Sequence, residues 1–100
     1  MKRIVLLCAA GMSTSLLVTK MQEAAAKEGY ECEIEAHSVI EASRWIPQAD
    51  VVMIGPQVRY ELERLRRENP DVPIEPMDMM LYGMVDGAGL LKQARELAGE

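Results

Sequence analysis

Short apolar runs alternate along the chain with segments of helical periodicity, and this alternation is the strongest constraint on the fold. Segments of strand character fall at residues 4–7, 31–37, 51–54 and 73–77. Helical patterns follow them, over residues 13–27, 40–46, 57–68 and from 86 onward. Repeated β-α units predict a parallel sheet with helices on both faces. We therefore expect an α/β fold in a single domain spanning residues 1–100, a normal length for one domain.

The character of the four strands predicts their order in the sheet. Residues 4–7 and 51–54 are continuous apolar runs, typical of central strands buried on both faces. The second strand alternates acidic and apolar residues and the fourth contains prolines, so both belong at edges. The order 2-1-3-4 with right-handed crossovers satisfies both conditions. Ligands of such sheets bind where the order reverses, which here is between the first and third strands.

Cys8 directly follows the first strand and precedes a loop that leads into a helix. The loop consists of Ala9, Ala10, Gly11, Met12, Ser13, Thr14 and Ser15. Small residues let the backbone close around a ligand, and a helix N-terminus supplies unpaired N–H groups and partial positive charge. This combination predicts an anion site that favours a thiolate, a nucleophile suited to phosphoryl transfer. The alternative is that Cys8 is a small buried hydrophobe and that Ser13 or Thr14 only caps the helix.

Other phosphate chemistries lack residues that they need. A cysteine-dependent phosphatase carries an arginine six positions after the cysteine, where this chain has Thr14. Without that arginine the loop can hold phosphate but stabilises a hydrolytic transition state poorly, which favours a carrier over a hydrolase. A phospho-aspartate receiver needs an aspartate after the third strand, where Gly55 stands. The Walker motif GxxxxGK[ST] does not occur in the sequence.

Composition excludes several further classes. The net charge of -5 argues against nucleic acid as a partner, because phosphate-backbone binders present a basic face. Cys8 and Cys32 form no CxxC motif and His37 is the only histidine, so a structural zinc site is not expected. No run approaches the roughly 18 apolar residues of a membrane span. Two thiols without a disulfide framework suit the reducing cytosol.

Three segments of the chain resemble one known family. The run from Cys8 to Val18 resembles the phosphorylation loop of IIB proteins of the lactose/cellobiose/chitobiose family, in the bacterial phosphoenolpyruvate-dependent sugar phosphotransferase system. Residues 55–58 resemble the second loop of that family, and residues 81–87 resemble its third. The resemblance therefore covers nearly the whole chain, and it implies the architecture of low-molecular-weight tyrosine phosphatases and flavodoxin-like proteins.

The resemblance also implies a relay. A phosphohistidine on a IIA protein would phosphorylate Cys8, which would pass the group to a sugar on the membrane protein IIC. The sugar would be a β-linked disaccharide such as cellobiose, chitobiose or lactose. Residues 9–15 would cradle the phosphate, and Gln57 and Tyr82 either line the site or serve the fold alone. No metal or other cofactor is implied, and the protein would work in the cytoplasm at the inner face of the membrane. A phosphatase-like hydrolase and a non-catalytic regulatory domain remain as alternatives.

Four further residues have structural interpretations. Cys32 alternates inward on the second strand and is expected in the core. His37 is expected to be exposed at the end of the same strand. Trp45 is expected to pack a short helix, and Asp86 is expected to cap the last helix rather than act as an acid. Met12, beside small residues in the Cys8 loop, is predicted to pack against IIA and IIC.

Overall fold

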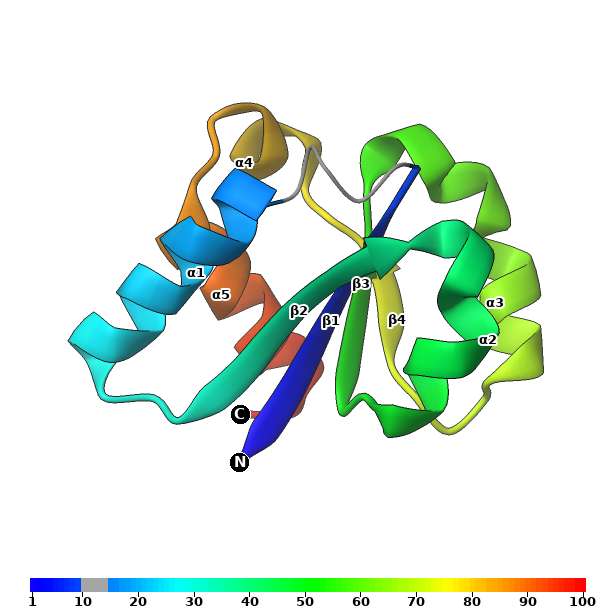
Figure 1. The fold of residues 1–100 in the computed structure, drawn as a ribbon, viewed down its shortest axis with the longest axis horizontal. Coiled ribbons are helices and arrows are strands. Elements are labelled where there is room, and N and C mark those ends of the chain that lie inside the picture. Colours follow the sequence, from blue (N-terminus) through cyan, green and yellow to red (C-terminus); the bar gives the residue numbers. More distant parts are fainter. Residues whose placement is uncertain (10–14) are drawn as a thin grey trace.

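A four-stranded parallel sheet forms the centre of the molecule in this computed structural model, which describes residues 1–9 and 15–100 (Figure 1). The strands are β1 Lys2–Cys8, β2 Cys32–Ser38, β3 Val51–Ile54 and β4 Ile74–Pro76. They lie in the order β2-β1-β3-β4, and every neighbouring pair is parallel. The fold class and strand order predicted from the sequence are confirmed.

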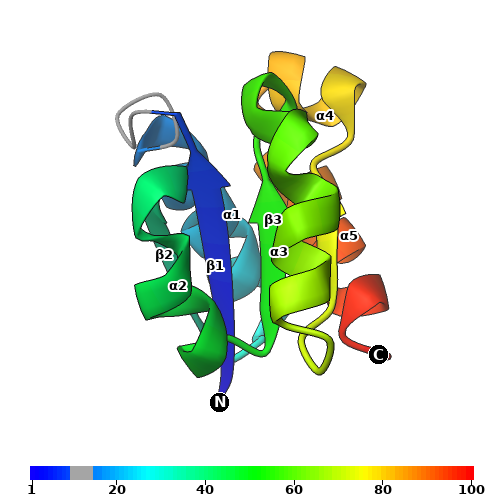
Figure 2. The ribbon, with the colours of Figure 1, turned by 90° about the vertical axis from the view of Figure 1, so that its right-hand side faces the viewer.

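Helices cover both faces of the sheet (Figures 1 and 2). One face carries α1 Ser15–Glu28 and α5 Gly87–Leu97, and the other carries α2 Ala42–Trp45 and α3 Leu62–Glu68. Three 3₁₀ segments adjoin these helices: η1 Val39–Glu41, η2 Ile46–Gln48 and η3 Pro56–Glu61. The short helix α4 Met79–Gly83 follows β4 and lies near the carboxyl end of the sheet, at the top of Figure 1.

Alternate residues of the central strands fill two separate cores, as the period-two geometry of a strand requires. Ile4 and Leu6 of β1 face the α1 and α5 side, whereas Val5 and Leu7 face the α2 and α3 side. β3 divides in the same way and is buried along its whole length. The continuous apolar runs of the sequence therefore correspond to strands that are covered on both faces.

The helical segments depart from the sequence prediction in three places. The predicted helix 40–46 is divided among η1, α2 and η2 and continues to Gln48, because the fixed φ of Pro47 suits the first turn of η2. The predicted helix 57–68 is 3₁₀ in its first half, and Val58 (φ -115°, ψ 20°) interrupts the helical geometry. Helix α4 was not predicted. Asp78 Oδ1 caps it by accepting from Met80 N at 2.9 Å and Leu81 N at 3.0 Å.

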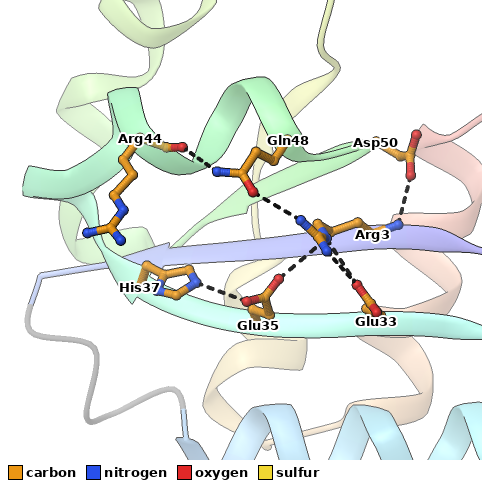
Figure 3. Close-up of polar contacts among 7 residues, drawn as sticks. All are labelled: Arg3, Glu33, Glu35, His37, Arg44, Gln48 and Asp50. Atoms are coloured by element: carbon orange, nitrogen blue, oxygen red, sulfur yellow. Dashed lines mark hydrogen bonds and ion pairs between the residues drawn. The ribbon is translucent and has the colours of Figure 1, made fainter.

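Arg3 ties the first half of β1 to its surroundings (Figure 3). Its guanidinium donates to Glu33 Oε2 at 2.8 Å and to Gln48 Oε1 at 3.1 Å, and it lies 3.5 Å from Glu35 Oε2. Its backbone N–H donates to Asp50 Oδ2 at 2.8 Å. Each exposed ion pair is screened by solvent and stabilises little by itself, but together these contacts hold β1 against β2 and the approach to β3.

The two ends of β2 correct one prediction and support two others. His37 is not exposed: its side chain is 19% accessible and stacks on Trp45, with ring centroids 3.7 Å apart and planes 4° apart. Trp45 also packs against the α2 and α3 core, as predicted. Cys32 turns inward and packs against the α1 and α5 core while remaining half-buried, and this burial raises the pKa of its thiol.

Candidate functional site

Cys8 ends β1 between the carboxyl ends of two neighbouring strands. It pairs in register with Ser38 on one side, and on the other Leu7 pairs with Ile54. Gly55 continues from β3 and its N–H donates to Leu7 O at 2.7 Å, so the second loop starts directly beside Cys8. Cys8 is 1% exposed. The predicted point of strand-order reversal is therefore where this cysteine lies.

Gly55 has no side chain where the second loop passes Cys8. A Cβ atom at Gly55 would lie 3.6 Å from Cys8 Cβ and 3.2 Å from Gln57 Oε1. The backbone of Gly55 has ordinary extended angles, so the glycine is not needed for an unusual conformation. Its absent side chain instead leaves a small space that borders both Cys8 Cβ and Gln57 Oε1.

A hydrogen bond joins the second and third loops at this edge. Gln57 Nε2 donates to the Tyr82 hydroxyl at 3.3 Å. The Tyr82 ring packs against the α1 and α5 core, whereas Gln57 is exposed. The structure thus brings together two residues that the sequence singled out separately, and it anchors only one of them in the core.

Ser38 is a neighbour of the site that sequence reasoning missed. Its Oγ donates to Ala9 O at 3.5 Å and accepts from Ile40 N at 3.2 Å. This side chain therefore links the first residue after Cys8 to the end of β2. The only signal for it is the register of β1 with β2, which a local sequence pattern does not contain.

The remaining residues that the sequence singled out are compared with the structure as far as it describes them. Asp86 caps α5, with its Oδ1 accepting from Gly89 N at 2.9 Å, as predicted. Ala9 and Ser15 are both exposed, and Ser15 lies in α1. Ala10, Gly11, Met12, Ser13 and Thr14 lie outside the described residues, so the anion loop and the Met12 contact remain predictions.

Residues 1–9 and 15–100 contain neither a metal-binding cluster nor a membrane-spanning helix. In that part of the chain no three His, Cys, Asp or Glu side chains are grouped so that they could hold a metal ion. None of its helices is both long and apolar enough to span a membrane.

Exposed apolar side chains gather around one end of the molecule. Apart from Met1, every large apolar side chain that is exposed in the described ranges lies on a segment that follows a strand. These residues are Leu16 in α1, Ile40 in η1, Tyr60 in η3, and Met79, Met80 and Met84 in or beside α4. Because the strands are parallel, these segments start at the carboxyl edge of the sheet, where Cys8 lies. We call this set the apolar rim.

Comparison with known proteins places the chain in one family. Residues 3–93 match the family model described as "PTS system, Lactose/Cellobiose specific IIB subunit". The oligo-β-mannoside-specific EIIB component of Bacillus subtilis (strain 168) is 46% identical over 99 residues, covering 97% of this chain and 96% of that protein. The solution structure of the cellobiose-specific phosphotransferase IIB component from Borrelia burgdorferi is 33% identical, with a TM-score of 0.81 over 98% of this chain and 92% of that one.

A more distant likeness concerns the fold alone. The crystal structure of a YwlE mutant from Bacillus subtilis superimposes with a TM-score of 0.59 at 14% identity, covering 99% of this chain and 97% of that one. The family model and the close relative span nearly all of the chain and agree with each other. The chain therefore belongs to the lactose/cellobiose-specific IIB family and is a phosphotransferase component of the sugar phosphotransferase system.

Proposed function

We propose that Cys8 is the residue of this IIB protein that carries the phosphoryl group. The observation that supports it most is the position of Cys8, at the reversal of strand order and beside the side-chain-free Gly55. Cys32 is a poor alternative because it lies at the opposite end of β2, paired with Lys2. Burial raises the pKa of the Cys32 thiol, which disfavours the nucleophilic thiolate.

The proposed relay consists of two successive phosphoryl transfers. Cys8 sulfur forms a bond to phosphorus as the N–P bond of a IIA phosphohistidine breaks, and the thiol proton ends on the imidazole nitrogen. A hydroxyl oxygen of the sugar on IIC then forms a bond to phosphorus as the S–P bond breaks, and the hydroxyl proton returns to the Cys8 sulfur. The backbone and hydroxyls of residues 9–15 cradle the phosphoryl oxygens in this proposal, and Gln57 and Tyr82 line the site.

The transported sugar is proposed to be a β-linked disaccharide such as cellobiose, chitobiose or lactose. The family description names lactose and cellobiose, and the two similar proteins are described as specific for oligo-β-mannosides and for cellobiose. The chain would act in the cytoplasm, at the inner face of the membrane, because its acceptor is bound there by IIC.

The apolar rim supports docking of protein partners at the Cys8 end. Exposed apolar side chains that surround a reactive residue are typical of protein interfaces, and methionine adapts to more than one partner surface. IIA and IIC must both bring their reacting groups to Cys8, so both are proposed to cover this rim in turn.

A low-molecular-weight phosphatase-like hydrolase is the alternative from the same fold. One observation favours a carrier: Thr14 occupies the position of the phosphatase arginine. The likeness to YwlE does not decide between them because it concerns the fold only. A non-catalytic regulatory domain is disfavoured by the presence of Cys8 itself.

The nucleophile is tested by incubating variants with phosphorylated IIA and locating phosphate by intact and peptide mass spectrometry. Cys8→Ser should abolish labelling, whereas Cys32→Ser, the matched control, should keep it. Full labelling of Cys8→Ser would refute the proposal.

The carrier is separated from the hydrolase by the lifetime of isolated phospho-Cys8. The phosphoprotein should persist in buffer and discharge rapidly to unphosphorylated IIA or to sugar-loaded IIC. Each tenfold loss of hydrolysis rate corresponds to about 1.4 kcal/mol of barrier, and the missing arginine removes several such factors. Rapid release of phosphate without partners, or efficient cleavage of an aryl phosphate, would favour the hydrolase.

A further inference from the structure

We infer that the Gln57 side-chain amide reverses its orientation when Cys8 is phosphorylated, and that the Tyr82 hydroxyl stabilises both orientations. Gln57 thereby becomes a side-chain donor to the phosphoryl group, and Tyr82 becomes its positioning residue. This inference rests on the proposed role of Cys8.

The Gln57 amide and Cys8 border the same small space at Gly55. The point where a Gly55 Cβ would stand is 3.2 Å from Gln57 Oε1 and 3.6 Å from Cys8 Cβ. Both atoms therefore border the space that a Gly55 side chain would fill, and a phosphoryl group on Cys8 sulfur, which extends several bonds beyond Cβ, is proposed to enter that space. Gly55 itself has no side chain that could stand between Cys8 and the Gln57 amide.

The orientation in the unphosphorylated protein is unsuited to a bound phosphoryl group. Nε2 donates to the Tyr82 hydroxyl at 3.3 Å, which leaves Oε1 on the side of Gly55 and Cys8. The amide oxygen accepts hydrogen bonds and carries partial negative charge. A phosphoryl group is dianionic or nearly so, and it repels such an oxygen. Phosphorylation therefore favours a half-turn of the amide.

Tyr82 permits this half-turn without losing its own hydrogen bond. A phenolic hydroxyl is both donor and acceptor, so it can donate to Oε1 after the turn as readily as it accepts from Nε2 before it. Its ring is held against the α1 and α5 core, and the cap of Asp78 fixes the first turn of α4. The hydroxyl is thus a fixed anchor for the exposed Gln57 side chain in both states.

Three variants test the inference in the full chain. Gln57→Glu keeps the shape of the side chain but replaces the amide donor by an anionic acceptor. Tyr82→Phe keeps the ring that packs in the core and removes the hydroxyl. Gln22→Glu is the matched control, because Gln22 is exposed on α1 beside Met1 and Tyr30 and away from the Cys8 edge. Each is equilibrated with phosphorylated IIA, and the phosphorylated fraction is measured.

Gln57→Glu should shift this transfer equilibrium away from phospho-Cys8 by about tenfold or more, since a hydrogen bond to a charged group is lost and a like charge is added. Tyr82→Phe should shift it by about threefold, and Gln22→Glu should leave it unchanged. The Gln57 side-chain amide resonances should move on phosphorylation of the wild-type protein, and move less in Tyr82→Phe. A fold-only role of these residues would alter the melting temperature instead.

The outcomes separate this inference from the proposed function. If the wild-type protein accepts no phosphate at Cys8, the proposed function fails. If Cys8 is phosphorylated but Gln57→Glu behaves as Gln22→Glu does, only the inference is refuted. Amide resonances of Gln57 that do not respond to phosphorylation would also overturn it.

Discussion

At the residue scale, Tyr30 shows how one side chain joins the ends of several elements far from the site. It lies between α1 and β2, its hydroxyl donates to Glu100 Oε2 at 2.9 Å, and the Arg95 guanidinium lies 4.1 Å from its ring centroid. Arg95 also pairs with Glu28 at 3.0 Å. Burial of the phenol, together with its hydrogen bond to Glu100, raises the pKa of Tyr30 to about 12.

This raised pKa predicts a loss of stability in alkali. An unfolded tyrosine titrates near 10, so the folded state holds the proton more tightly, and the resulting stability is fully present below about pH 10. It is lost as the pH rises through about 12. The pKa of the Cys32 thiol is also raised by burial, so Cys32 adds a loss of unfolding free energy that starts at a lower pH than that of Tyr30. Tyr30→Phe should therefore reduce, but not abolish, the alkaline fall in unfolding free energy.

The measurement is urea unfolding at a series of alkaline pH values. Tyr60→Phe serves as the control, because Tyr60 is 78% exposed and should give the wild-type profile. An alkaline decline in Tyr30→Phe as steep as that of the wild-type protein would show that this phenol does not contribute.

At the scale of elements, α1 and α5 approach each other closely. Gly87, the first residue of α5, faces the backbone of Lys20 in α1, and a Cβ at Gly87 would meet the Lys20 carbonyl carbon and lie 2.5 Å from its oxygen. Backbone atoms cannot move aside as a flexible side chain can. The close approach of the two helices that cover one face therefore depends on this glycine.

Gly87→Ala should lower the free energy of unfolding by about 1–3 kcal/mol through this overlap. Gly83→Ala is the matched control, because nothing lies within 4 Å of its added Cβ and Gly83 ends the short helix α4. Alanine's helix preference should make Gly83→Ala neutral or stabilising by up to about 1 kcal/mol. Urea unfolding of both variants checks this, and equal stability of Gly87→Ala and the wild-type protein would contradict it.

The sequence predicts those elements whose buried residues form a clear pattern of apolar side chains. Strands β1 and β3 follow from their continuous apolar runs, and α1 stops at Gly29, whose φ of +66° favours glycine. Helix α4 has no buried residue, so it leaves no apolar periodicity to detect. In η3, Val58 is buried in the α2 and α3 core with non-helical angles, an arrangement that no local pattern of residues predicts.

The same distinction applies to the candidate site. Cys8 and Gly55 could be placed together because topology brings the ends of β1 and β3 to one edge. The Gln57–Tyr82 hydrogen bond joins side chains from two loops, and the Ser38–Ala9 hydrogen bond joins a side chain of β2 to the backbone that follows β1. Their geometry is decided by strand register and loop path, which no local pattern of residues contains.

At the scale of the whole molecule, the two ends of the sheet differ in character. The amino end of the strands carries ion pairs and hydrogen bonds such as those of Arg3, whereas the carboxyl end carries the apolar rim. Binding of partners at the rim therefore need not disturb the contacts that hold the strands together.

Ile40, which is 87% exposed in η1, tests the rim. Ile40→Asp should weaken the complex with IIA by about fivefold, because an apolar interface contact is replaced by a charge that must be desolvated. The melting temperature should be unchanged, since Ile40 packs against neither core. Ala26→Asp adds the same carboxylate to an exposed position on α1 beside Met1 and should leave IIA binding unchanged. Equal binding of IIA by both variants would show that Ile40 is not part of the docking surface.

The stack of His37 on Trp45 gives the protein a built-in optical probe. Trp45 is the only tryptophan in the chain, so intrinsic indole emission has a single source. Its ring lies against His37, the neighbour of Ser38, whose hydroxyl contacts the carbonyl of the residue after Cys8. Indole emission depends on what lies against the ring. Fluorescence of the unlabelled protein should therefore follow rearrangements at this end of β2 as partners dock and leave, in real time.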